Sequence, residues 1–141
     1  MEASGEANTW EVIYLKHFVG NIEELTEKNE FFRQVVFTAP HSQLVLMSLK
    51  PKEEIGEEVH DVDQFFRFEE GEGKVVIDGE ESEVRDGWAV VVPAGARHNI
   101  INSSETQNLK LYTIYSPANH PDGTVHKSKE EAVAAEEKEN H

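Results

Sequence analysis

The stretch from Gly87 to Asn102 constrains the fold of this chain more than any other. A short run of Ala and Val is followed by Pro93-Ala-Gly95. One histidine, His98, then precedes Asn-Ile-Ile-Asn102. Proline presets φ and glycine accepts a positive φ, so this triplet predicts a tight turn between two strands. The segment therefore predicts two short strands joined by a turn, with a histidine opening the second strand.

Short strand-like runs separated by turn signals fill most of the chain. We expect strands at residues 9–15, 31–38, 43–49, 74–77, 80–85, 88–92, 98–102 and 109–115. Asp78-Gly79 is a hairpin signal, and Asn21 followed by acidic residues predicts one capped helical turn over residues 21–25. Many short strands with little helix predict an all-β sandwich or barrel.

The length of 141 residues predicts a single domain. Residues 1–8 are small and acidic without periodicity, and we expect them to be disordered. Residues 9–126 form the predicted domain. Residues 127–141 are a charged C-terminal tail, at most a solvated helix.

Composition excludes several classes of function. The chain has no cysteine, which rules out disulfides, thiolate metal sites and a cysteine nucleophile. Its formal charge of −15 argues against a nucleic-acid partner. The longest apolar run, Ala89 to Val92, is too short to span a membrane, so we expect no membrane partner. No signal-like segment opens the chain, so we expect a cytoplasmic protein.

A second informative stretch precedes the first one. If residues 58–68 stay extended, alternation places these side chains on one face: Glu58, His60, Gln64, Phe66 and Phe68. Three polar groups among aromatic rings are costly to bury without partners. A metal ion would satisfy all three at once.

The two stretches together resemble the cupin family. Every specified position of the second cupin motif is matched, by Gly87, Pro93, Gly95, His98 and Asn102. The first motif matches in spacing with two changed ligands. Glu58 stands at the first His position, His60 at the second, and Gln64 at the Glu position. A rival alignment that starts on His60 would put Val62 and Phe66 at ligand positions, where neither can coordinate.

This resemblance implies a cupin double-stranded β-helix, a jelly-roll barrel with a metal in its mouth, and often a homodimer. The implied ligands of one divalent transition metal are Glu58, His60, Gln64 and His98. Mixed nitrogen and oxygen ligands suit Zn, Fe, Mn, Ni or Co without discriminating among them. Met47, Phe66 and Phe68 are expected inside the barrel, as core or as pocket wall.

Two classes of function stay open, and both involve a small-molecule ligand or substrate. The chain is similar to small cupins described as mannose-6-phosphate-isomerase-like, which implies a metal-dependent enzyme, either sugar isomerase-like or a dioxygenase. Glu58 would then be a ligand or a catalytic base. The alternative is a non-catalytic module that binds a ligand or a metal, because the neutral Gln64 weakens metal binding.

Histidines outside the two motifs are assigned no role. His120 and His126 could form a second metal site, but we expect them to be loop histidines in solvent. Alternation points Arg97 away from the barrel interior.

Overall fold

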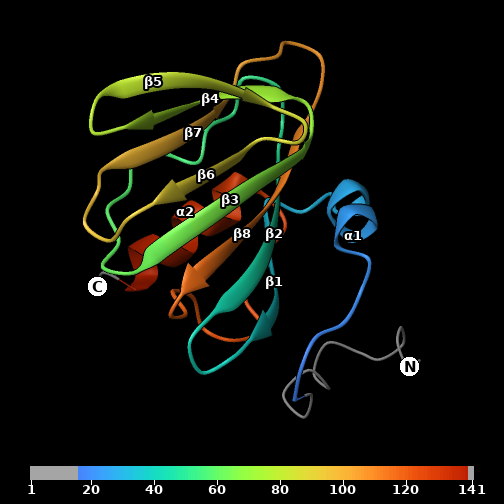
Figure 1. Cartoon of the computed structure of the whole chain (residues 1–141), viewed down its shortest axis with the longest axis vertical. Helices are drawn as coiled ribbons and strands as arrows, with labels where there is room; N and C mark the ends of the chain where they lie inside the picture. The colour runs from blue at the N-terminus through green and yellow to red at the C-terminus, as the bar shows by residue number, and fades with distance from the viewer. Residues whose placement is uncertain (1–15, 140–141) are drawn as a thin grey trace.

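Two antiparallel sheets face each other in the computed structural model, which describes residues 16–139 (Figure 1). The larger sheet has the strand order β6-β3-β8-β2-β1-β9 and the smaller sheet β5-β4-β7. The larger sheet comprises β1 (Arg33–Thr38), β2 (Gln43–Leu49), β3 (Asp63–Glu70), β6 (Ala89–Val92), β8 (Leu109–Ser116) and β9 (Val125–His126). The smaller sheet comprises β4 (Glu72–Ile77), β5 (Glu80–Arg85) and β7 (His98–Asn102). The predicted all-β jelly roll is confirmed.

Strand register defines the inner face of the larger sheet, because directly paired residues of antiparallel strands point to the same side. Three successive rows cross β3, β8 and β2: Gln64, Tyr115 and Gln43; Phe66, Thr113 and Val45; Phe68, Leu111 and Met47. All of these residues are buried. The first row is polar and the last is apolar, so the barrel has a polar end and an apolar end.

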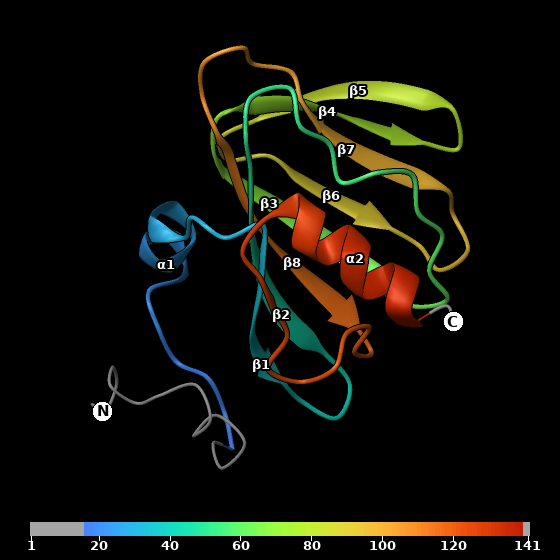
Figure 2. The ribbon, with the colours of Figure 1, turned by 180° about the vertical axis from the view of Figure 1, so that it is seen from behind.

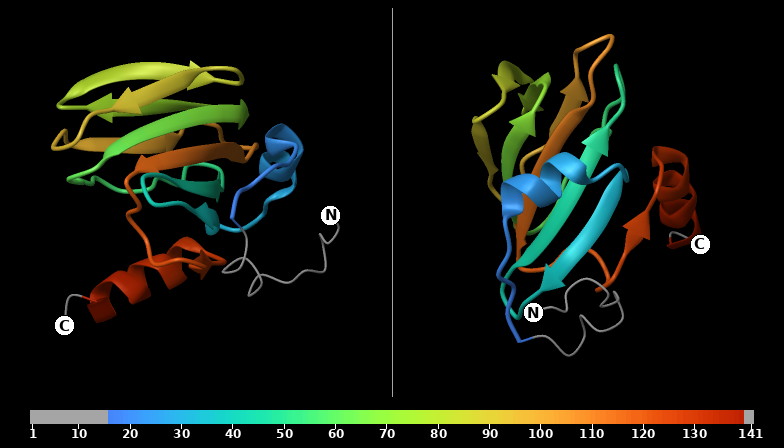
Figure 3. Two further views of the ribbon diagram at one scale, coloured as in Figure 1. Left: turned by 60° about the horizontal axis from the view of Figure 1, so that its bottom comes forward. Right: turned by 90° about the vertical axis from the view of Figure 1, so that its right-hand side faces the viewer.

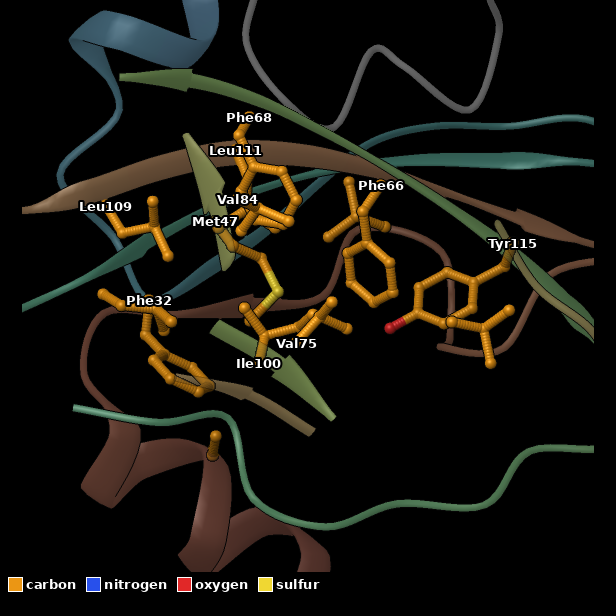
Figure 4. Packing of buried hydrophobic residues seen from close by; sticks show 14 of the residues in the cluster. Phe32, Met47, Phe66, Phe68, Val75, Val84, Ile100, Leu109, Leu111 and Tyr115 are labelled. Carbon is orange, nitrogen blue, oxygen red and sulfur yellow. The ribbon is translucent and has the colours of Figure 1, made fainter. Parts of the chain in front are cut away.

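The apolar end holds the hydrophobic core (Figure 4). The rings of Phe66 and Phe68 lie parallel, with centroids 6.5 Å apart. Val75 and Ile100 of the smaller sheet close the core from the other side, and Tyr115 lies at one end of the cluster beside Phe66 (Figure 4). Each large apolar side chain buried in this way contributes about 1.5–3 kcal/mol.

Two helices lie on different sides of the sandwich (Figures 2 and 3). Helix α1 (Ile22–Lys28) begins at Asn21, whose Oδ1 accepts a hydrogen bond from the Glu24 backbone N–H at 3.1 Å, which confirms the predicted cap. Helix α2 (Lys129–Glu139) lies against β9 and places Ala132, 2% exposed, in the core. The predicted solvated tail therefore includes a docked helix.

The hairpin between β4 and β5 turns at Asp78 and Gly79, whose φ values of 49° and 87° suit the tight turn that joins twisted strands. The predicted strand at residues 9–15 and the predicted disorder of residues 1–8 lie outside the described part of the chain. Among residues 16–139 no helix is long and apolar enough to cross a membrane.

Candidate metal centre

The segment that carries Glu58 lies along the edge of β7 instead of continuing β3. Glu58 and His98 exchange two backbone hydrogen bonds, of 2.8 and 2.9 Å, and form an isolated bridge. The chain bends at residues 61–62, and β3 begins only at Asp63. The expectation of one extended face from residue 58 to residue 68 is therefore wrong for its first half. Glu58 reaches the barrel from the smaller sheet, while Gln64 reaches it from the larger one.

The predicted Pro-x-Gly turn holds His60 close to His98. Ala96 N donates to the Pro93 carbonyl at 3.1 Å, and Gly95 takes a φ of 90° that a side chain would oppose. Gly95 N also donates to the His60 carbonyl at 2.8 Å. The turn that precedes β7 is thus fastened to the loop that precedes β3.

Three of the four predicted ligands converge at the polar end of the barrel. One candidate ligand atom from each of Glu58, His60 and His98 lies within 4.8 Å of the other two. His60 Nε2 lies 3.1 Å from Glu58 Oε1, and the two imidazole centroids are 5.4 Å apart. The geometry therefore brings together one carboxylate and two imidazoles from segments far apart in the chain.

His98 presents a ring nitrogen with a free lone pair. Its Nδ1 lies 3.0 Å from the Ala96 carbonyl oxygen, which can only accept, so Nδ1 carries the proton. Nε2 is then an acceptor, and it is buried without a hydrogen-bond partner in the described part of the chain. A buried lone pair of this kind fits a metal ligand, since buried polar atoms otherwise find partners.

Glu58 is held in its ionised form. Burial acts to raise its pKa, but the hydrogen bond from His60 and the electrostatic interactions with His60, and to a smaller extent with Arg33, outweigh burial, so the pKa lies below its ordinary value. An ionised carboxylate accepts only, so His60 Nε2 donates to it. Glu58 thus offers one negative charge to a cation.

Gln64 is buried beside this cluster, and the NH2 group of its side-chain amide is hydrogen-bonded. Its Nε2 donates to Thr113 Oγ1 at 3.0 Å, and its amide also acts on the Tyr115 hydroxyl, whose pKa it tends to lower. Among residues 16–139 no hydrogen-bond partner is found for its Oε1. The unpartnered oxygen fits a neutral oxygen ligand. His98 Nε2 and Gln64 Oε1 are thus two acceptors that the protein buries and leaves available.

Two neutral groups complete the polar end: Tyr115, which sequence reasoning missed, and His120, which it expected in solvent. The Tyr115 ring lies edge-on to His60, with centroids 5.7 Å apart, and the Tyr115 hydroxyl lies 3.3 Å from His120 Nε2. Burial raises the pKa of Tyr115, so its hydroxyl stays protonated. Burial lowers the pKa of His120 to about 3, so its ring is neutral.

The prediction that His120 lies in solvent is wrong because Gln43 holds its loop against the barrel. Gln43 Oε1 accepts from the backbone N–H groups of Asn119 and His120, each at 3.0 Å, and Gln43 Nε2 donates to the His120 carbonyl at 2.8 Å. His126 is likewise engaged, with Nδ1 at 3.1 Å from Nη1 of Arg33. Arg97 points outward as predicted, within 3.8 Å of Glu57.

An open hollow of about 640 Å³ lies above His60. Its lining residues are Val59, His60, Asp61, Ala94, Gly95 and Asn119. Met47, Phe66 and Phe68 are buried in the core, and Phe66 lies edge-on to His98 with centroids 6.2 Å apart. Asn102 is buried, and its Nδ2 donates to the carbonyls of Leu49, Lys50 and Gln107, so it fixes strand ends.

Two facing antiparallel sheets with a His/Glu cluster at one end define a small β-barrel of the cupin type. The family model described as "Cupin domain" matches residues 45–115, and the chain belongs to this family. An uncharacterized protein of Acanthamoeba polyphaga mimivirus is 50% identical over 113 residues, covering 77% of this chain and 70% of that protein. The uncharacterized protein YrkC of Bacillus subtilis is 49% identical over 129 residues, covering 86% of this chain and 69% of YrkC.

A solved structure is also similar over most of its length. The crystal structure of BH2720 from Bacillus halodurans superposes with a TM-score of 0.81 at 44% identity, covering 83% of this chain and 93% of that one. None of these three protein names states an activity, so the function has to be argued from the site.

Proposed function

We propose that this cupin binds one divalent transition metal and acts on a small organic molecule as a metal-dependent enzyme. Glu58, His60 and His98 would hold the ion, and the Gln64 amide oxygen would be a fourth ligand. The observation that carries the proposal is the buried Nε2 of His98, for which residues 16–139 supply no hydrogen-bond partner, in a residue with a ligand atom within 4.8 Å of ligand atoms of Glu58 and His60.

The residues around the cluster divide into groups that bind the ion and groups that serve a substrate. When bound, such an ion polarises a carbonyl or hydroxyl oxygen of the substrate. Tyr115 can donate a hydrogen bond to a substrate oxygen, because its hydroxyl is protonated. The hollow above His60 gives a small molecule access to this end of the barrel.

A metal titration of chelator-treated protein tests the binding half of this proposal. A ligand that binds only the folded state adds about 2.7 kcal/mol of stability at a hundred times its Kd. We therefore expect Zn²⁺, Mn²⁺, Fe²⁺, Co²⁺ or Ni²⁺ to raise the melting temperature by several degrees, with saturation at one ion per chain. If none of these ions shifts the melting temperature, the proposal fails.

The reaction class follows from two further assays. A sugar isomerase would exchange substrate protons with solvent deuterium and run with a redox-inert ion, whereas a dioxygenase would consume oxygen and need a redox-active one. Glu58→Ala should abolish either activity.

A non-catalytic binding module is the second candidate, and one observation favours it. Within the cluster, the only carboxylate is Glu58, which is already engaged by His60, and Gln64 is a neutral amide. No uncommitted acid in the cluster is then available to move a proton. A Glu58→Ala variant that changes metal occupancy while the wild type turns over no substrate would support this reading.

A further inference from the structure

The outer face of the larger sheet carries a line of apolar side chains that crosses five strands. Directly paired residues of antiparallel strands point to the same side of a sheet, and these residues are paired one after another. Phe65 lies between the inward-facing Gln64 and Phe66 in β3, so the line is on the side of the sheet away from the core. We call it the outer row, and it comprises Val91 of β6, Phe65 of β3, Ile114 of β8, Leu44 of β2 and Phe37 of β1.

The outer row is incompletely covered. Val91 is 66% exposed and the other four side chains are half-buried, whereas the inward-facing Phe66 is 1% exposed. Helix α2 lies on the other side of the sheet, behind β3 in Figure 1 and in front of it in Figure 2. Helix α1 contacts the sheet beside Leu46, which is 4% exposed and lines one groove with Leu25 of that helix. Five adjoining apolar side chains that stay this open indicate an interaction surface.

The charges beside the outer row cancel, although the chain as a whole carries −15. On β3 the outward-facing neighbours of Phe65 are one acid, Asp63, and one base, Arg67. On β8 the residues paired with them are Ser116 and Tyr112. The surface is far more acidic elsewhere, as in β5, where three of the six residues are exposed glutamates. An apolar and aromatic centre with few charges is typical of the core of a protein interface.

We infer that the outer row is the interface between two copies of this chain, which pack face to face about a two-fold axis that runs along the row. Each member of the row then meets its own counterpart, as residues on the axis of a two-fold interface do. The axis also reverses the strand direction, so Asp63 of one copy faces Arg67 of the other on both sides of Phe65. Facing sheets lie about 10 Å apart, a gap that these two side chains span together.

Self-complementarity favours a second copy over an unrelated partner. Rotation about the outer row exchanges the two ends of each strand. On β3 this exchange brings an acid against a base, and on β8 it brings the small Ser116 against the large Tyr112. An unrelated partner would not require the two sides of the row to match each other in this way.

The inference goes beyond the proposed function and does not rest on metal binding. None of the residues that line the hollow above His60 belongs to the outer row, so the two surfaces are separate.

Sedimentation velocity of the full chain at micromolar concentration measures the association. We expect a dimer, with twice the chain mass of 16.0 kDa. Val91→Lys should weaken the dimer by at least about tenfold, because two lysines would meet on the axis and facing like charges are strongly unfavourable. Val91 is on the edge strand β6 and exposed, so the variant should keep its fold. Val133→Lys, at a position 42% exposed on α2, is the matched control and should dimerise as wild type does.

Charge reversal tests the orientation of the two copies. Asp63→Arg alone sets two arginines against each other, and Arg67→Asp alone sets two aspartates, so each variant should dimerise at least about tenfold more weakly. Mixing the two variants should restore a heterodimer, since every contact then joins an arginine to an aspartate. Native mass spectrometry identifies the heterodimer by its intermediate mass. Asp63 also accepts a hydrogen bond from Ala94 N at 2.9 Å, so the melting temperature of each variant is measured first, and Val91→Lys decides the inference if Asp63→Arg does not fold.

The outcomes separate this inference from the proposed function, because every measurement is made without added metal. A monomeric wild type overturns the inference and leaves the outer row to a partner of another kind. A dimer that Val91→Lys leaves intact uses a different face, which also overturns the inference. Folded charge variants that do not associate when mixed overturn the orientation about the row.

Discussion

At the polar end of the barrel, His98 and Gln64 each use one side-chain nitrogen as a hydrogen-bond donor and leave a second polar atom free to accept. His98 donates through Nδ1 to Ala96, and Gln64 donates through Nε2 to Thr113. Their free atoms, Nε2 and Oε1, are both buried acceptors. Leaving such an atom unpaired costs about 1–3 kcal/mol. The metal-free protein therefore carries a local penalty that a cation would remove.

Gln64→Glu should tighten metal binding and destabilise the metal-free protein. The new carboxylate would add a second negative charge to the ligand set, and we expect the metal Kd to fall by about tenfold or more, equivalent to about 1.4 kcal/mol. Without metal, a buried carboxylate lacking a partner lowers the free energy of unfolding. Metal titration and urea denaturation measure the two effects. Gln107→Glu, at an exposed loop position, is the control. A Kd equal to or weaker than that of wild type would contradict the role given to Gln64.

His120 should make the fold sensitive to acid. Its pKa of about 3 in the folded protein lies below the ordinary value of 6.5, so the fold keeps the ring neutral. This contribution to stability is complete above about pH 6.5 and declines as the pH falls towards 3. We expect the melting temperature of His120→Gln to fall less than that of wild type between pH 7 and pH 4. His41→Gln, at an exposed position, should behave as wild type. Parallel pH profiles for all three proteins would show that His120 is not buried as described.

The pairing of β4 with β7 depends on close contact between their backbones. A Cβ on Gly73, in β4, would lie 2.5 Å from the Ile101 carbonyl oxygen of β7. Because this neighbour is backbone, it cannot move aside without disturbing the β4–β7 pairing that positions His98 at the other end of β7. Gly73 therefore serves the site through the spacing of two strands.

Gly73→Ala should destabilise the protein much more than Gly87→Ala. We expect a loss of at least about 3 kcal/mol for Gly73→Ala, the upper part of the range for overpacking. Gly87 has a φ of 89° but open space around it, so its replacement should cost about 1–2 kcal/mol of backbone strain. Urea denaturation of both variants makes the comparison. A smaller effect at Gly73 than at Gly87 would show that β4 and β7 are not packed as closely as the structure has them.

At the scale of the whole molecule, most of the strands and most of the candidate ligands could be predicted from the sequence, but the short strand β9 was not. The strands over residues 43–49, 80–85 and 98–102 have the predicted bounds. Glu58, His60 and His98 converge as the two motifs indicated. These features are local in origin, since alternation, turn residues and motif spacing are all read along the chain.

The rest of the site could not be predicted because it depends on contacts between distant segments. His120 is turned inward by the Gln43 side chain, from another strand. The bend at residues 61–62 breaks an alternation that the sequence shows without interruption. Periodicity indicates which residues share a face of a strand, but not which segments pair.

The metal content of protein purified without an affinity tag or chelator tests the central claim most directly. We predict about one transition-metal ion per chain in the wild type, as expected for a site with several protein ligands. His60→Ala and His98→Ala should each retain less than about a tenth of that, since losing a ligand is more severe than the tenfold to hundredfold loss seen on removing a supporting group. Arg97→Ala, which changes the neighbour of His98 on the outer side, should keep the metal. A wild type without metal whose melting temperature no added ion raises, or a His98→Ala variant that stays fully loaded, would contradict the account.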